Sequence, residues 1–318
     1  MRKLVLSFVT LFSFISLLAG NGYEVKLKQQ TNTTTTIGFT VNEFDFKTVK
    51  LNGINFTKII FDGKVLTKEK GFAELPFVNA NVQLNPFKNV SMGVNPLEYT
   101  DIQLEFPLVP SRGVIYRNQD PTQIPYEIAP ESMVDAFYPE SFTKITEPYI
   151  IKDVRGTTVY FYPFQYNAVT QTLRVFTEVE VVLSQNNDES VNPLYQTSGK
   201  YFPEMEGLYK SVFINYENSR DDLTVADAGD ILVITTSRDE DAIQPYIDWK
   251  MEKGYDVFKE VVSTGTNVKS LIQQKYDENN DINYVQLVGD WADIKCDLGG
   301  GANAPMDPML GCVVGSDS

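Results

Sequence analysis

Two residue types on which much enzyme chemistry depends are scarce in this sequence. Its 318 residues contain no histidine and only two cysteines, Cys296 and Cys312. The lack of histidine excludes Ser-His-Asp and Cys-His catalysis within these residues, and it excludes most zinc sites. The two cysteines are either free thiols or one disulfide across a short loop. Any hydrolytic chemistry therefore requires catalytic groups that these residues do not contain.

Positive charge is also scarce. Lys and Arg number 27 against 42 Asp and Glu, which gives a formal net charge of −15. Nucleic acids and anionic membrane surfaces bind clustered basic residues, so neither is expected as a partner. The imbalance is uneven, because residues 221–318 contain 19 acidic and 7 basic side chains while residues 1–220 contain 23 and 20. This shift predicts a domain boundary near Arg220.

Long apolar runs are confined to the start of the sequence. Met1–Lys3 is basic, Leu4–Leu18 is apolar, and Gly20–Gly22 offers a small-residue cleavage context. The run is shorter than the roughly 20 residues that a membrane anchor needs. The pattern predicts a signal peptide over residues 1–22, an exported soluble chain and no membrane span.

Residues 23–220 are typical of an all-β domain. Thr157–Tyr162 is β-branched and aromatic, and Leu173–Val181 alternates apolar and polar residues, so the two are interpreted as a hairpin. Strands at this spacing, separated by Pro, Gly and Asn clusters, predict a β-sandwich. Pro110–Arg117 is interpreted as an exposed loop that leads into a strand. Further strands are expected at residues 23–28, 36–41, 56–61 and 102–106.

Residues 221–318 change to an α/β pattern. The near-continuous apolar run at 230–236 is typical of a strand in a sheet covered on both faces. A helix capped by Ser237 or Asp239 is expected to end at Gly254. A strand at 255–262, a helix capped by Thr266 and a strand at 284–289 are expected to follow. With right-handed crossovers, this βαβαβ order predicts three layers around a parallel sheet.

Asp290 and Arg220 are the candidate functional residues that the pattern itself indicates. Asp290 follows the third strand, at the edge where open α/β sheets bind ligands, and begins an acidic loop. A loop rich in oxygen ligands suits Ca²⁺, and a solvated acidic loop is the alternative. Arg220 lies in a polar stretch at the composition boundary, where it is either a processing site for a trypsin-like protease or an ordinary surface arginine.

Several motifs resemble the gingipain-type cysteine peptidases. Asp248–Gly254 is similar to the family's DWK-x-x-x-G helix end, Tyr284–Asp290 to its YVxLVGD strand end, and Val313–Asp317 to its IVGND segment. Upstream, Ser111–Asn118 and Tyr162–Asn167 are similar to parts of the family's propeptide. The resemblance runs from about residue 70 to the last residue, with the motifs in the family's order.

The resemblance implies a fold and a mode of regulation. Residues 221–318 are then the first, incomplete part of a caspase-like α/β catalytic domain, and residues 23–220 are a prodomain that keeps the zymogen latent. Family members are cleaved after a basic residue between these parts, which corresponds to Arg220. If the prodomain occludes the active-site cleft of a mature protease, a basic loop residue is expected to mimic the substrate there, and Arg112 and Arg117 are the candidates.

The resemblance also implies a structural calcium ion. In the family, the aspartate that ends the YVxLVGD strand binds calcium together with a valine carbonyl and an aspartate of the IVGND segment. Matched residue by residue, these ligands are Asp290, Val314 and Asp317. Further ligands are expected beyond Ser318.

The family's catalytic histidine and cysteine lie downstream of the IVGND segment, so neither Cys296 nor Cys312 matches the nucleophile. The sequence is therefore expected to be the N-terminal part of a secreted cysteine endopeptidase zymogen, which cleaves polypeptides through a His-activated thiolate beyond residue 318 and is inactive as given. One alternative is a non-catalytic secreted surface or binding protein. The other is a prodomain-type protease inhibitor that acts in trans.

Overall fold

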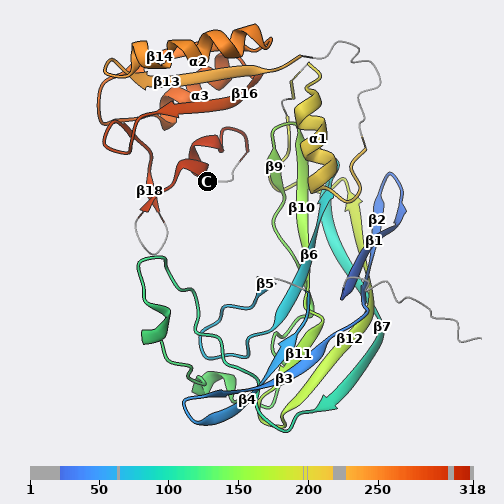
Figure 1. Ribbon diagram of the computed structural model, residues 1–318. Coiled ribbons are helices and arrows are strands. Elements are labelled where there is room, and N and C mark those ends of the chain that lie inside the picture. The colour runs from blue at the N-terminus through green and yellow to red at the C-terminus, as the bar shows by residue number, and fades with distance from the viewer. Residues whose placement is uncertain are drawn as a thin grey trace, which may run out of the picture.

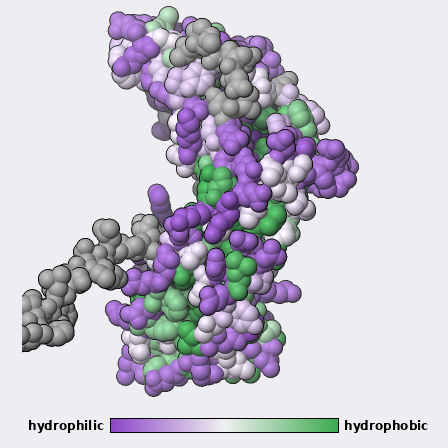
Figure 2. Space-filling model, turned by 90° about the vertical axis from the view of Figure 1, so that its right-hand side faces the viewer, coloured by the Kyte–Doolittle hydropathy of each residue, from purple (hydrophilic) through white to green (hydrophobic). Residues whose placement is uncertain are grey.

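The chain folds into a β-sandwich followed by a smaller α/β unit (Figure 1). The computed structural model describes residues 22–62, 65–195, 197–198, 200–217, 227–299 and 304–315. The predicted signal peptide and Arg220 lie outside these residues, as does Asp317. Hydrophilic side chains cover most of the face in Figure 2, with scattered apolar groups over the sandwich.

Two sheets form the sandwich. The first has the order β1-β2-β12-β11, with β7 also paired to β12, and these strands comprise Tyr23–Gln30, Thr34–Val41, Thr172–Asn186, Phe164–Asn167 and Asn89–Gln103. The second has the order β5-β6-β10-β8, with β9 also paired to β10, and comprises Val65–Leu66, Pro76–Gln83, Val154–Phe161, Thr143–Ile145 and Tyr149–Ile151. A separate hairpin joins β3 (Asp45–Leu51) to β4 (Ile54–Ile60).

The core of the sandwich is built from every second residue of its strands. Ile37 and Phe39 of β2 meet Val159 of β10, and Val179 of β12 lies in the same buried cluster. Successive side chains of a strand point to opposite faces, so this spacing places one face of each sheet inward. The predicted β-sandwich is therefore confirmed in outline.

The hairpin expected between Thr157–Tyr162 and Leu173–Val181 is wrong. The first segment lies in β10, which pairs with β6, β8 and β9, whereas the second lies in β12 of the other sheet. The chain passes from one sheet to the other at Pro163, which has no N–H to donate to a ladder. The hairpin partner of β12 is β11 instead. The pattern could not distinguish strands on opposite sheets from neighbours in one sheet.

The region between β7 and β8 is less regular than predicted. The strand expected at 102–106 ends at Gln103, as the last part of β7, and the stretch Pro110–Arg117 does not lead into a strand. Between 104 and 142 the regular elements are two 3₁₀ turns, at Pro121–Gln123 and Pro130–Ser132. We call residues 104–142 the long loop. Its ends pack on the sandwich, where Leu104 and Leu108 are buried, and its middle extends away from the sandwich on the side of β18 in Figure 1.

Helix α1 (Pro203–Val212) completes the sandwich side. Its Tyr209 packs with Val154 of β10 and with Phe213, the residue that follows the helix. Asn215 then exchanges hydrogen bonds with the main chain of Gln83, at 2.7 and 3.1 Å. The helix is thus fixed to the second sheet, although it lies just before the predicted boundary.

The α/β unit has the predicted three layers. Parallel strands are ordered β14-β13-β16. Ile231 and Val233 of β13 pack with Ile247 of α2, whereas Leu232 and Ile234 face the opposite helix, α3. The elements are β13 (Asp230–Thr236), α2 (Glu240–Glu252), β14 (Asp256–Val262), α3 (Lys269–Glu278) and β16 (Ile282–Val288).

The predicted ends of α2 are confirmed, but the predicted start of α3 is wrong. Asp239 is the N-cap of α2, and Gly254 follows its end with a φ of 92°. Thr266, however, is not the cap of α3, because Thr266–Asn267 forms a short strand, β15, that pairs with β17 (Ile294–Lys295). The N-cap is Val268, and Asn267 accepts the N–H of Lys269 at 3.1 Å.

Short elements end the described chain. β18 (Leu298–Gly299) pairs with β19 (Ala304–Pro305), and a 3₁₀ turn follows at Asp307–Gly311. Among the described residues, no helix has the length and apolar character needed to cross a membrane.

Candidate functional site

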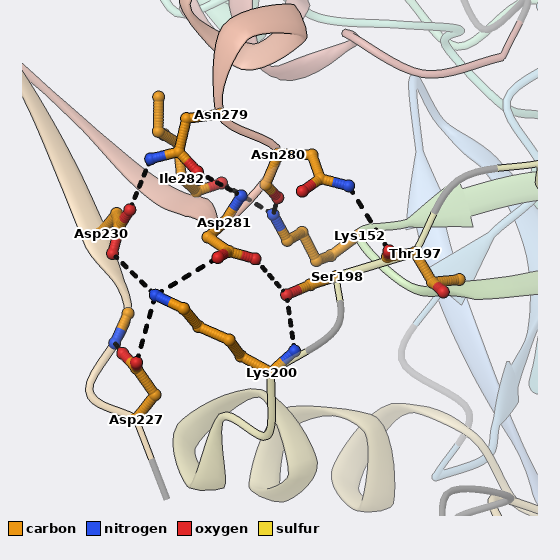
Figure 3. Close-up of polar contacts among 11 residues, drawn as sticks. Lys152, Thr197, Ser198, Lys200, Asp227, Asp230, Asn279, Asn280, Asp281 and Ile282 are labelled. Carbon is orange, nitrogen blue, oxygen red and sulfur yellow. Dashed lines mark hydrogen bonds and ion pairs between the residues drawn. The ribbon is translucent and has the colours of Figure 1, made fainter. Parts of the chain in front are cut away.

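The candidate site lies where the sandwich meets the α/β unit, and we call this contact the junction. On the sandwich side it is formed by the turn between β9 and β10, by Thr197, Ser198 and Lys200, and by α1 (Figure 3). On the other side it is formed by the amino-terminal ends of β13 and β16 and by the turn that joins α3 to β16.

Lys200 is the central cation of the junction. Its Nζ lies 3.2 Å from Asp227 Oδ2, 3.2 Å from Asp281 Oδ2 and 3.9 Å from Asp230 Oδ1 (Figure 3). Burial opposes the charge of the ammonium group, but the hydrogen bonds with Asp227 and Asp281 prevail and raise the pKa of Lys200 above its ordinary value. One sandwich residue thus binds three carboxylates of the α/β unit.

Asp230 is the buried member of this set. Its side chain is 4% exposed, and its Oδ2 accepts Asn279 Nδ2 at 2.6 Å. Burial raises the pKa of Asp230, while the hydrogen bond from Asn279 and the charge of Lys200 oppose the rise. The pKa of Asp227 is instead lowered, first by the N–H of Gly229 and then by Lys200. The junction therefore contains Asp227, whose charged form is stabilised, and Asp230, whose charged form is destabilised by burial.

Lys152 and Ser198 add contacts on either side of Lys200. Lys152 lies in the turn between β9 and β10, with a φ of 51°, and its Nζ donates to the carbonyl of Ile282 at 2.9 Å and to that of Asn280. The Ser198 hydroxyl donates to Asp281 Oδ1, and its own N–H donates to Asp153 Oδ1 at 2.8 Å. These bonds hold the turn before β16 against the sandwich.

Glu204 of α1 also forms hydrogen bonds with the α/β unit. Its two carboxylate oxygens accept the hydroxyls of Tyr255, at 3.0 Å, and Tyr284, at 2.5 Å. These hydrogen bonds lower the pKa of Glu204, whereas burial and then Glu204 itself raise the pKa of Tyr284. Because the tyrosines come from the start of β14 and from β16, α1 bridges two strands of the parallel sheet.

An apolar cavity of about 280 Å³ lies beside these polar contacts. Ile150, Ile151 and Leu208 line it from the sandwich, and Ile282 and Val314 line it from the α/β unit. At its border Gly315 approaches the sandwich closely, since a Cβ there would lie 3.1 Å from Ile150 Cδ1. The junction is therefore a mixed interface with a polar row and an incompletely filled apolar part.

This arrangement holds two units together through polar and apolar contacts, and one free thiol, Cys312, lines its cavity. Cys296 is 4% exposed and donates to Asp307 Oδ1 at 3.1 Å, and both cysteines are free thiols. Burial, followed by the hydrogen bond with Asp307, raises the pKa of the Cys296 thiol, so it stays protonated. That neither Cys296 nor Cys312 is the catalytic nucleophile stays a prediction.

The predicted calcium ligands are not brought together among the described residues. Asp290 follows the carboxyl end of β16, and its Oδ1 accepts the N–H of Ala292 at 2.7 Å. Val314 lines the cavity with Ile282, at the amino end of the same strand. Asp317 lies outside the described residues, and no group of three His, Cys, Asp or Glu within the described ranges could hold a metal. The calcium site stays a prediction.

The two candidate arginines of the long loop differ in their surroundings. Arg112 Nη1 donates to the carbonyl of Pro121, and its guanidinium lies 4.5 Å from the ring centroid of Tyr126. Arg117 is exposed, next to a turn in which the N–H of Gln119 donates to the carbonyl of Tyr116 at 3.0 Å. The contacts of Arg112 therefore stabilise the long loop, whereas the side chain of Arg117 is exposed.

Sequence reasoning did not identify the junction. Its residues are polar and carry no motif, so Lys152, Ser198 and Lys200 have the pattern of ordinary turn and surface residues. The one available signal was Asp230, a carboxylate at the start of a fully apolar strand, which requires a partner when it is buried.

Comparisons with known proteins give matches over both units. The family model described as Propeptide_C25 matches residues 18–223. Gingipain R2 of Porphyromonas gingivalis (strain ATCC BAA-308 / W83) is 30% identical over 336 residues, which cover 100% of this chain and 45% of the relative. Gingipain R1 of Porphyromonas gingivalis is 32% identical over 257 residues, which cover 78% of this chain and 25% of the relative. The chain therefore spans less than half the length of these curated relatives.

A solved structure gives a further match. A chain from the complex of Porphyromonas gingivalis RgpB pro- and mature domains aligns with a TM-score of 0.54 at 31% sequence identity. The alignment covers 61% of this chain and 98% of the solved one.

Proposed function

The chain belongs to the Propeptide_C25 family and carries the propeptide region of a gingipain-type cysteine peptidase, and from this we propose that it is the N-terminal part of a secreted zymogen kept latent by residues 23–220. The observation that carries the proposal is the junction, where sandwich side chains bind the α/β unit directly. The family match favours this function over a non-catalytic surface or binding protein.

The α/β unit is, in this proposal, the first part of a caspase-like catalytic domain. Its parallel order β14-β13-β16, with helices on both faces, supports that assignment. The complete enzyme attacks a peptide carbonyl with a thiolate that a histidine activates, through an acyl-enzyme. Both groups come from outside these 318 residues, which contain no histidine, and the substrates are polypeptides.

Latency, in this proposal, depends on the long loop as well as on the junction. Arg117 is the residue presented to the active-site cleft, because it is exposed beside the Tyr116–Gln119 turn. Arg112 supports the loop from within through its contacts with Pro121 and Tyr126. Cleavage after Arg220 separates the prodomain from the α/β unit covalently and leaves the junction as the contact between them.

Calcium has no role in this proposal. The carboxylate of Asp293, next to Asp290, is already bound by Arg238, and Asp290 Oδ1 is occupied by a main-chain N–H. We therefore leave a calcium ion at Asp290 out of the proposal. A signal peptide over residues 1–22 is part of the proposal and directs export.

Two experiments on residues 23–318 test the proposal. Incubation with a peptide panel and a reductant should give no thiol-dependent cleavage, and cleavage would overturn the assignment of the dyad to later residues. Limited trypsin digestion in the 218–226 segment should leave two fragments that co-elute in size-exclusion chromatography. Fragments that separate on cleavage would show that the junction does not hold the prodomain.

A further inference from the structure

The carboxyl edge of the parallel sheet has a feature that the proposed function does not use. In the order β14-β13-β16, β13 leads into α2 on one face of the sheet, whereas Ile294 and Cys296, which follow β16, pack in the cluster of α3 on the opposite face. Such a switch point between neighbouring strands is where open α/β sheets place ligands. Here the two loops, residues 237–239 and 289–293, are joined by an ion pair.

Arg238 supplies the cation of this pair. Its Nη1 donates to Asp293 Oδ1 at 3.0 Å and its Nη2 donates to Asp293 Oδ2 at 2.8 Å. Nη2 also donates to Asp239 Oδ2 at 2.7 Å, and Nε lies 3.2 Å from both oxygens of Asp239. Two parallel N–H···O bonds to one carboxylate form the strong, directional kind of Arg–carboxylate contact. One guanidinium therefore neutralises carboxylates from both loops.

Burial and main-chain hydrogen bonds fix the position of Asp293. Its side chain is 6% exposed, its N–H donates to the carbonyl of Asp290 at 3.0 Å, and its carbonyl accepts the N–H of Gly265 at 2.7 Å. Gly289 permits the turn, because it has a φ of 139° and a Cβ there would lie 2.9 Å from Asp293 Cβ. The backbone thus directs a buried carboxylate at Arg238.

We propose that the guanidinium of Arg238 is a built-in cation that closes the carboxyl edge of the sheet, in place of the divalent ion that the resemblance implies at Asp290. Calcium requires six to eight oxygen ligands. Of the four carboxylate oxygens of Asp290 and Asp293, three already accept N–H groups. A divalent ion at this position would also be repelled by the adjacent guanidinium.

The position of Val314 also argues against a divalent ion at Asp290. It lines the junction cavity with Ile282, Asn283 and Val285 of β16, whereas Asp290 follows the carboxyl end of that strand and does not line this cavity. The described part of the chain therefore does not bring Val314 and Asp290 to one cavity.

Thermal unfolding of residues 23–318 tests this inference. The wild-type midpoint should be the same in millimolar calcium and in excess EGTA. Arg238→Ala should lower the midpoint by several degrees and should make it rise again with calcium, because Asp239, Asp290 and Asp293 then lack a cation. Arg238→Lys should fall between the two, since an ammonium group cannot form the bidentate contact.

Two further variants control for a general loss of charge. Asp293→Asn removes the buried partner and should lower the midpoint more than Asp239→Asn, whose side chain is 26% exposed. A wild-type unfolding midpoint that falls in EGTA would overturn the inference. This measurement does not require any of the variants to fold. Equal midpoints for wild type and Arg238→Lys, or for Asp293→Asn and Asp239→Asn, would also count against it.

Discussion

Replacement of Lys200 by methionine should weaken the junction without disturbing either unit. The change removes the cation that binds Asp227 and Asp281 at 3.2 Å each and lies 3.9 Å from the buried Asp230. Because the Lys200 side chain is 37% exposed, each pair is screened and contributes at most about 1 kcal/mol. Asp230 keeps its hydrogen bond from Asn279, which limits the penalty of leaving it without a cation.

The expected loss is therefore about 1–2 kcal/mol, which corresponds to roughly a 5- to 30-fold increase in the dissociation constant of the cleaved fragments. Analytical ultracentrifugation of the chain cut at 218–226 measures this constant. The matched control is Lys210→Met, because Lys210 also lies on the sandwich side but pairs with Glu206 of the same helix at 3.0 Å. Salt should weaken the wild-type complex more than the Lys200 variant. Equal constants and equal salt dependence for the two variants would refute the role of Lys200.

Four other predictions concern individual charged groups. Asp230→Asn should leave the junction as strong as before or stronger, because burial raises the pKa of Asp230 and makes its charge costly; ultracentrifugation of the cleaved complex checks this. The lowered pKa of Asp227 stabilises the folded state above pH 3.8, its ordinary pKa, and this contribution is lost as the pH falls below 3.8 and through the lowered pKa. Protonation of Asp230, whose pKa is raised, acts in the opposite sense. The fragments should therefore co-elute in mild acid and separate only below pH 3.8. Arg155→Met should lower the free energy of unfolding by about 4 kcal/mol in urea titrations, because the buried Arg155, 1% exposed, donates to four main-chain carbonyls. In the complete zymogen, Arg117→Ala should raise activity before processing, whereas Lys68→Ala, a change on the exposed surface outside the loop, should not.

The sequence predicted those parts of the fold in which local chemistry leaves few alternatives. Residues 231–234 are apolar at successive positions, and only a strand covered on both faces buries all of them. Gly254 ends α2 because it adopts a φ of 92° without a steric penalty. Thr266 misled the prediction because a threonine before a helical pattern resembles an N-cap, yet here tertiary pairing with Ile294 decides its conformation.

The junction escaped prediction for a different physical reason. Lys200 meets Asp281 across 81 residues of sequence, and neither residue has a local pattern that distinguishes it from a solvated charge. The same holds for Arg238 and Asp293, which become partners only because β13 and β16 are neighbours in the sheet. Periodicity reports which face of an element is buried, and it carries no information on which polar side chains meet where two elements end.

The opposite ends of β13 and β16 now have distinct roles in the proposed zymogen. Their amino ends bind the sandwich through Lys152, Ser198 and Lys200, while their carboxyl ends are closed by Arg238 and face away from these contacts. The long loop, drawn in green, extends on the side of β18 in Figure 1, well apart from α1. A prodomain held at two separate places behaves as a bivalent ligand, for which the second contact forms at a high effective concentration once the first is made. Cleavage of the segment 218–226 alone should therefore not activate the enzyme, and the Lys200→Met and Arg117→Ala changes should each release part of the latency, with a combined effect larger than either.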